Sequence, residues 1–137
     1  MNVFVVNAGS SSLKFQVIAT DLDRIKQDND HLLCRGEVER IGGEAIITLQ
    51  SDSGHREKLT APIHDVPAAV DYVLRWLASD RSGIDEIRSL GDIHAAGHRV
   101  VHGGEFFKES VVIDDEVLKG IEDCIDLAPL HNANNVR

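Results

Sequence analysis

The chain has 137 residues, of which 42% are hydrophobic and 27% are charged. This balance is typical of a globular domain with one hydrophobic core, and it excludes disorder along the whole length. Fourteen Lys and Arg residues against 23 Asp and Glu residues give a net charge of -9. That charge argues against nucleic-acid binding, which needs basic residues to replace counterions. It is compatible with an anionic small ligand, because a lysine, backbone N–H groups and a divalent cation can reverse the field within one cleft.

The sequence has no run of 18 apolar residues, and its first residues, Met-Asn-Val-Phe-Val-Val-Asn, do not resemble a signal peptide. We therefore expect a cytoplasmic protein that does not enter a membrane. Cys34 and Cys124 are the two cysteines, and they form no CxxC pair. We interpret them as buried, reduced thiols rather than as a zinc or redox site.

The first half of the chain predicts β-strands. Residues 3–6 form a short apolar run, which is typical of a buried central strand. Ser12–Ala19 alternates between apolar and polar residues, and the short turn before it predicts a hairpin. Residues 21–30 are mostly polar, and we interpret them as an exposed connection. Residues 31–40 predict a third strand that is broken at Gly36.

A second hairpin and a helix follow. Residues 44–50 and 55–61 flank the turn sequence Ser-Asp-Ser-Gly and predict two paired strands. Asp65 is a suitable N-cap for a helix that has Pro67 in its first turn. Apolar residues then recur at helical spacing and predict one buried stripe. The stripe consists of Val66, Ala69, Val70, Val73, Leu74 and Leu77.

The last third predicts one more strand and one more helix. Residues 93–102 predict a strand that ends at a Gly-Gly pair. Asp114 can cap a helix that Pro129 ends. Residues 130–137 look like the opening of another element, so we expect the chain to be incomplete. The predicted inner face of this helix is Val117, Leu118, Ile121, Cys124 and Ile125.

The turn of the first hairpin is rich in small and hydroxyl-bearing residues. It reads Asn-Ala-Gly-Ser-Ser-Ser from position 7 to position 12. Small residues let backbone N–H groups approach a ligand, and hydroxyl groups add hydrogen-bond donors. Ser12 and Lys14 share one strand face, and Asn7 closes the first strand. This set suits a phosphate chain with its metal ion. The alternative is an ordinary Gly/Ser turn beside an exposed lysine, since neither a Walker A motif nor a GxGxxG fingerprint is present.

Residues 97–105, Gly-His-Arg-Val-Val-His-Gly-Gly-Glu, predict a second ligand-binding region. Arg99 and Val101 share one face of the predicted strand. The planar fork of Arg99 matches a carboxylate or a phosphate, and Val101 could line a small pocket for a short alkyl group. The alternative is that Arg99 forms a structural ion pair.

Three histidines, His94, His98 and His102, are spaced four residues apart. On a helix they would share a face and form a candidate metal site. The segment predicts a strand, on which they spread over about 13 Å from end to end. We therefore interpret them as ordinary histidines at the surface or at the edge of the core.

Three motifs together resemble the acetate kinase family of short-chain carboxylate kinases. Residues 5–15, Val-Val-Asn-Ala-Gly-Ser-Ser-Ser-Leu-Lys-Phe, are similar to the N-terminal signature of the family. Residues 98–104 are similar to its second signature, His-Arg-Val-Val-His-Gly-Gly. Residues 127–132, Leu-Ala-Pro-Leu-His-Asn, match a third motif, after which Ala133 stands where the family has proline. His131 matches a motif position to which we assign no role.

The resemblance implies an α/β fold, a ribonuclease-H-like domain with a mixed β-sheet and flanking helices. Residues 1–137 would be the N-terminal domain, itself incomplete, of a two-domain acetate or propionate kinase. The function implied is reversible phosphoryl transfer from ATP to acetate or propionate, which forms an acyl phosphate. The catalytic residues would lie downstream of Arg137, so we expect the chain alone to be inactive. The full-length parent is expected to be a homodimer.

The resemblance also implies roles for individual residues. Asn7 would help to hold Mg²⁺, while Ser10, Ser12 and Lys14 would contact the phosphates of ATP. Arg99 and Val101 would bind the carboxylate substrate. Two other functions remain open: a non-catalytic nucleotide- or anion-binding module with the same fold, and a regulator of the Hsp70/actin type. Arg99 argues against the latter, because an arginine for a carboxylate has no evident use there.

Overall fold

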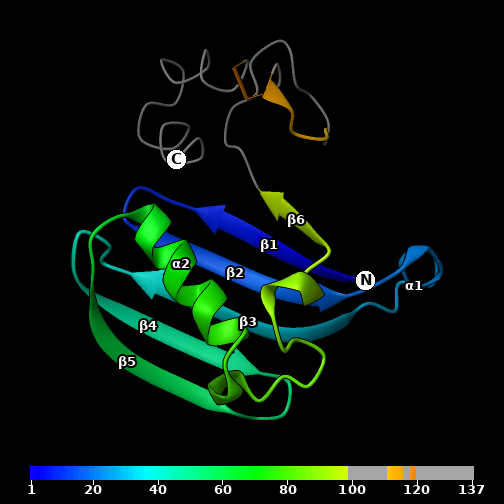
Figure 1. Ribbon diagram of the computed structural model, residues 1–137, viewed down its shortest axis with the longest axis horizontal. Coiled ribbons are helices and arrows are strands. Elements are labelled where there is room, and N and C mark those ends of the chain that lie inside the picture. Colours follow the sequence, from blue (N-terminus) through cyan, green and yellow to red (C-terminus); the bar gives the residue numbers. More distant parts are fainter. Residues whose placement is uncertain (99–110, 116–117, 120–137) are drawn as a thin grey trace.

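The computed structural model describes residues 1–98, 111–115 and 118–119. In this part of the chain six strands form one sheet in the order β5-β4-β3-β2-β1-β6 (Figure 1). The first five strands pair antiparallel, and β6 pairs in parallel with β1, so the sheet is mixed. The strands are β1 (Asn2–Ala8), β2 (Ser12–Ala19), β3 (His31–Glu39), β4 (Gly43–Ser51), β5 (Arg56–Ile63) and β6 (Ala95–His98).

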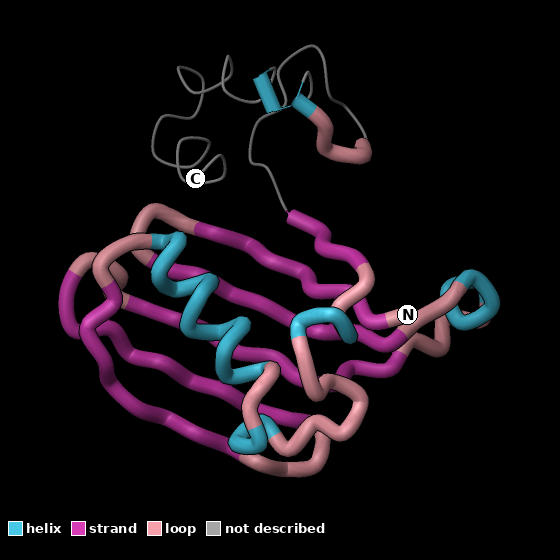
Figure 2. Tube along the Cα trace, viewed as in Figure 1, coloured by secondary structure: helices cyan, strands magenta, loops and turns pink. Residues whose placement is uncertain are grey.

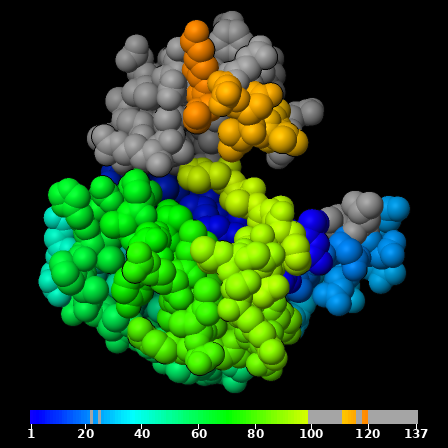
Figure 3. Space-filling view, viewed as in Figure 1, coloured from blue at the N-terminus to red at the C-terminus, as the bar shows by residue number. Residues whose placement is uncertain are grey.

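One face of the sheet is covered by the connection between β5 and β6. This connection contains α2 (Val66–Leu77), η1 (Asp80–Ser82) and η2 (Leu90–Asp92). Figure 2 shows α2 lying across the strands, and Figure 3 shows that α2 and the rest of the connection cover much of the near face. A parallel neighbour of β1 requires such a crossover, because the chain must return to the starting edge before β6. The mixed α/β fold predicted from the sequence is therefore confirmed.

The alternation in β2 separates a covered face from an open face. Leu13, Phe15 and Val17 are buried, whereas Lys14 and Gln16 are exposed. The register carries this division across the sheet, because directly paired residues lie on the same face. The predicted alternation of β2 is thus confirmed. The core on the covered face includes Phe4, Val6, Leu13, Phe15, Val17, Val38, Ile47, Leu49, Val73 and Leu77.

Helix α2 begins where the sequence predicts. Asp65 is the N-cap, and its Oδ1 accepts a hydrogen bond from the backbone N of Ala68 at 2.9 Å. Four residues of the predicted stripe, Val66, Ala69, Val73 and Leu77, are buried. The stripe prediction omitted Trp76, which is 3% exposed and packs edge-on against Phe15 with ring centroids 6.5 Å apart.

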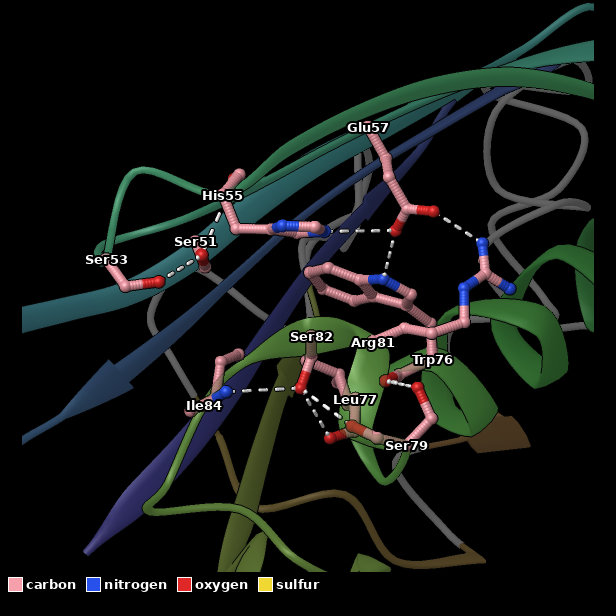
Figure 4. Close-up of polar contacts among 10 residues, drawn as sticks. All are labelled: Ser51, Ser53, His55, Glu57, Trp76, Leu77, Ser79, Arg81, Ser82 and Ile84. Atoms are coloured by element: carbon pink, nitrogen blue, oxygen red, sulfur yellow. Dashed lines mark hydrogen bonds and ion pairs between the residues drawn. The ribbon is translucent and has the colours of Figure 1, made fainter.

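Glu57 explains why the tryptophan turns inward. Its carboxylate accepts a hydrogen bond from Nε1 of Trp76 at 2.9 Å and pairs with Arg81 at 2.5 Å (Figure 4). Nε2 of His55 lies 3.5 Å from the same carboxylate. The pKa of Glu57 lies below its ordinary value, mainly because its carboxylate accepts a hydrogen bond from Arg81. The hydrogen bond from Trp76 lowers the pKa further. This cluster joins the start of β5 to the C-terminal end of α2.

One expectation from the sequence is refined by the structure and another is corrected. The polar stretch 21–30 connects β2 to β3, and its residues 21, 23, 24 and 26–30 are exposed, as expected. It also contains a short helix, α1 (Leu22–Lys26), near whose start Oδ1 of Asp21 accepts a hydrogen bond from the backbone N of Arg24 at 2.8 Å. Strand β3 continues through Gly36 instead of breaking there. A Cβ atom at position 36 would lie 2.5 Å from Cε1 of Phe15, so the glycine makes room for that ring. Gly36 stays paired with Phe15 on β2 and with Leu49 on β4, so the predicted break in β3 is wrong.

The second hairpin forms as predicted, with β4 and β5 each slightly longer than expected. Gly54 in its turn has φ +90°, which suits glycine.

Cys34 is buried and free, and burial raises the pKa of its thiol to about 12. Cys124, most of the predicted second helix and the predicted strand beyond His98 lie outside the described residues. Among the helices that are described, none is long and apolar enough to cross a membrane.

Candidate functional site

The β1–β2 hairpin brings the predicted phosphate-binding residues to one end of the sheet. Asn7 is directly opposite Lys14, and both are exposed on the open face. Directly opposed residues in antiparallel strands have Cβ atoms about 5 Å apart, so the amide and the ammonium group can act on the same ligand. Within the described residues, neither side chain has a hydrogen bond or an ion pair. Both groups are therefore available to a ligand.

The tip of the hairpin is held through its main chain. The backbone N of Gly9 donates to the carbonyl of Ser12 at 2.8 Å. The carbonyl of Ser11 accepts from the backbone N of Ile41 at 2.9 Å, which fixes the tip to the turn between β3 and β4. A Cβ atom at position 9 would lie 2.8 Å from Oγ of Ser12, so glycine lets this hydroxyl group approach the backbone. The tip is thus a fixed turn with Ser10 exposed and Ser12 half-buried.

Strand β6, the last described strand, ends beside this hairpin. Its last described residue, His98, is paired with Val6, and the next residue of β1 is Asn7. Arg99 and Val101 lie outside the described residues.

The histidines near β6 lie in separate environments. Nδ1 of His94 accepts a hydrogen bond from the backbone N of Asn2 at 2.9 Å. His98 lines an apolar cavity of about 580 Å³ on the covered face, between α2 and β6. His102 is outside the described residues. The described part of the chain holds no cluster of three His, Cys, Asp or Glu side chains arranged for a metal ion.

A polar groove extends from the hairpin over the open face of the sheet. Its volume is about 550 Å³, and it crosses the strands from β1 to β5. The sequence motifs did not reveal it, because its residues come from five different strands. The available signal was the alternation of β3, where Arg35 and Glu37 alternate with the buried Cys34 and Val38. The polar groups that line the groove include Asn7, Lys14, Arg35, Glu37, Gln50 and Arg56.

The described residues form an α/β domain with a mixed sheet. At one end of this sheet, the Gly/Ser turn of the first hairpin lies beside the amide of Asn7 and the ammonium group of Lys14, and it carries hydroxyl groups of its own. Residues 2–137 match the model of the Acetokinase family. The chain belongs to this family.

Similar proteins carry the same family name. The acetate kinase of Solibacter usitatus is 72% identical over 137 residues, which are 100% of this chain and 33% of that protein. The acetate kinase of Chloroherpeton thalassium is 48% identical over 142 residues and is covered to 34%. The chain thus spans about a third of the length of these curated relatives.

Solved structures agree with the fold. The crystal structure of Porphyromonas gingivalis acetate kinase superposes with a TM-score of 0.86 at 37% identity, covering 98% of this chain and 32% of that one. A propionate kinase from Francisella tularensis superposes with a TM-score of 0.79 at 29% identity, covering 98% of this chain and 31% of the other.

Proposed function

We propose that this chain is the N-terminal part of an enzyme that transfers a phosphoryl group reversibly between ATP and acetate or propionate, forming an acyl phosphate. Family membership supports the kinase class, and the names of the relatives support the two carboxylates. The observation that carries the proposal is the pairing of Asn7 with Lys14 beside the serine-rich tip. It puts an amide oxygen, a positive charge and hydroxyl groups at one end of the sheet.

Each hairpin residue has a role that follows from its chemistry. Ser10 and Ser12 hydrogen-bond to the phosphate oxygens of ATP, and Lys14 neutralises part of their negative charge. Phosphoryl transfer depends mainly on the position of the reactants and on the stabilisation of charge, so these groups suit the reaction.

Asn7 fits one ligand position of a magnesium ion. Mg²⁺ prefers oxygen ligands and keeps several water molecules, so one amide oxygen together with phosphate oxygens suffices from this side. When bound, Mg²⁺ neutralises charge on the phosphates. Lys14 opposite Asn7 would repel a bare cation, which favours binding of the ion together with ATP rather than before it.

Arg99 and Val101 supply the carboxylate side in this proposal. The guanidinium group binds the carboxylate or the phosphoryl group in transfer, and the valine contacts the short alkyl group. Residues 1–137 form one wall of the site, while the rest of a two-domain, homodimeric, cytoplasmic enzyme supplies the catalytic residues. The chain alone is therefore inactive, because in-line transfer needs donor and acceptor to be held together.

A chimera tests the roles at the hairpin. In it, these 137 residues replace the matching residues of the Solibacter usitatus acetate kinase, which is 72% identical to them. Lys14→Ala is expected to raise the KM for Mg-ATP or lower kcat, with little effect on the KM for acetate. Lys58→Ala removes an exposed lysine of β5 and is the matched control. Unchanged ATP kinetics in Lys14→Ala would contradict the phosphate role, and ATP binding without any transfer would favour the non-catalytic module.

The same chimera tests Arg99. Arg99→Lys is expected not to rescue Arg99→Ala, because lysine keeps the charge but loses the planar two-point contact. The expected loss in kcat/KM for acetate is about 10²-fold or more. Near-parent activity in Arg99→Lys would show that Arg99 acts only as a general positive charge.

A further inference from the structure

The groove on the open face of the sheet is lined by more basic than acidic residues, although the chain has a net charge of -9. Lys14, Arg35 and Arg56 line the groove there, against a single acidic residue, Glu37. Lys14 belongs to the hairpin, but the two arginines lie further across the sheet on β3 and β5. Nothing in the proposed kinase function uses them.

The strand register places the two arginines in one row. Arg35 is paired with Gln16 on one side and with Gln50 on the other, and Gln50 is paired with Arg56. Arg35 and Arg56 therefore stand on either side of Gln50 on the same face. Neighbouring strands are about 4.8 Å apart, so the Cα atoms of the two arginines are about 10 Å apart. Extended arginine side chains from both sides can reach one small ligand that lies above Gln50.

Both guanidinium groups are available to a ligand. Arg35 and Arg56 are exposed, and within residues 1–98, 111–115 and 118–119 neither side chain forms an ion pair or a hydrogen bond. Gln50 lies between them, and Thr48 lies in the neighbouring row opposite Glu37; both are half-buried in the same groove. Their amide and hydroxyl groups add hydrogen-bond donors to the ten N–H groups of two guanidinium groups.

We propose that Arg35, Gln50 and Arg56 form a second anion site, which binds a phosphate group on the open face of the sheet. Each guanidinium fork matches two oxygens of a tetrahedral phosphate, and two arginines balance its double negative charge. The ligand is free phosphate or the terminal group of a small phosphate ester. The site does not depend on the proposed role of the hairpin, because Ser10 and Ser12 take no part in it.

Titration of the isotopically labelled chain with inorganic phosphate, followed by amide NMR, tests the site. Chloride keeps the ionic strength constant, because exposed charges are screened by salt. We expect saturable shifts at residues 16, 35, 50 and 56. Arg35→Gln and Arg56→Gln should each weaken binding about tenfold, the loss typical of a charged hydrogen-bonding partner. Arg88→Gln removes an equally exposed arginine from the connection on the covered face and should leave binding unchanged.

Glu37→Gln should change the affinity for phosphate in the opposite direction to the two arginine variants. Glu37 lies two residues from Arg35 on the same face, so removal of its charge should strengthen phosphate binding about threefold. A variant that only perturbs folding would not tighten binding. Lys14→Gln should have a smaller effect than either arginine variant, which separates this site from the hairpin.

Several results would overturn the proposal. These are shifts that do not saturate, an equal loss of affinity in Arg88→Gln, and weaker binding in Glu37→Gln. Loss of phosphate binding in the folded chimera would show that the groove is an internal contact surface of the longer protein, and it would also refute the site. A parallel titration with glycerol phosphate identifies the source of the group: binding of the ester at the same residues supports a site for phosphorylated metabolites.

Discussion

Replacing Gly36 by alanine places a methyl group where the ring of Phe15 lies. The new Cβ atom would be 2.5 Å from Cε1 and 2.7 Å from Cζ of that ring, and 2.7 Å from the carbonyl oxygen of Thr48. The carbonyl belongs to the backbone of β4 and cannot rotate away. The ring itself is confined between Phe4 and Trp76, whose centroids are 5.8 Å and 6.5 Å from its own. Neither neighbour can move without disturbing the core.

The expected loss of stability in Gly36→Ala follows from these two clashes, with the ring of Phe15 and with the carbonyl oxygen of Thr48. Overpacking of a core typically costs 1–3 kcal/mol, and we expect Gly36→Ala to lie near the upper end, at about 3 kcal/mol. Gly43→Ala is the matched control: its Cβ would meet no atom within 4 Å, and its φ is not positive. The control should change the free energy of unfolding by less than about 1 kcal/mol, in the stabilising direction.

Urea unfolding followed by tryptophan fluorescence measures both variants. The chain has one tryptophan, Trp76, and it packs against Phe15, so the signal reports on the affected region. In a Phe15→Leu background the cost of Gly36→Ala should shrink, because the ring part of the clash is gone. Equal stability of Gly36→Ala and Gly43→Ala would refute the packing argument for the unbroken β3.

Two further predictions concern titratable groups. Because the pKa of Glu57 is lowered by Arg81 and Trp76, its contribution to stability is present above its ordinary pKa of 4.5 and is lost as the pH falls through the lower folded value. The melting temperature of Glu57→Gln should therefore fall less steeply below pH 4.5 than that of the parent, and parallel curves would contradict this. With a thiol pKa of about 12, only about 10⁻⁴ of Cys34 is thiolate at pH 8, so in a Cys124→Ser variant it should react with a thiol reagent only after denaturation. Rapid labelling of the native variant would show that Cys34 is accessible.

Local patterns in the sequence predicted the elements whose partners are close along the chain. The alternation of Ser12–Ala19 fixed which residues of β2 face the core, and Asp65 marked the first turn of α2. Contacts between distant segments were not predictable in this way. The ring of Phe15 occupies the space that a side chain at position 36 would fill, and the buried Trp76 donates its N–H group to Glu57 on another element.

The candidate sites also differ in whether their residues are close in sequence or come from distant segments. Asn7, the serines and Lys14 are close in sequence, so a motif could group them. Arg35 and Arg56 are brought together by the register of β3, β4 and β5, and this register depends on which face of each strand is buried. No motif within one segment carries that information.

We propose that residues 1–137 provide one wall of an acyl-phosphate-forming kinase, and one assay tests this directly. Purified chimera and purified chain 1–137 are each incubated with excess Mg-ATP and acetate, and acetyl phosphate is trapped as the hydroxamate. We expect turnover by the chimera, its loss in Arg99→Ala, and no turnover by the chain alone. A folded chimera without activity would contradict the kinase function, and turnover by the chain alone, abolished by Arg99→Ala, would contradict the division of the site between two parts of the protein.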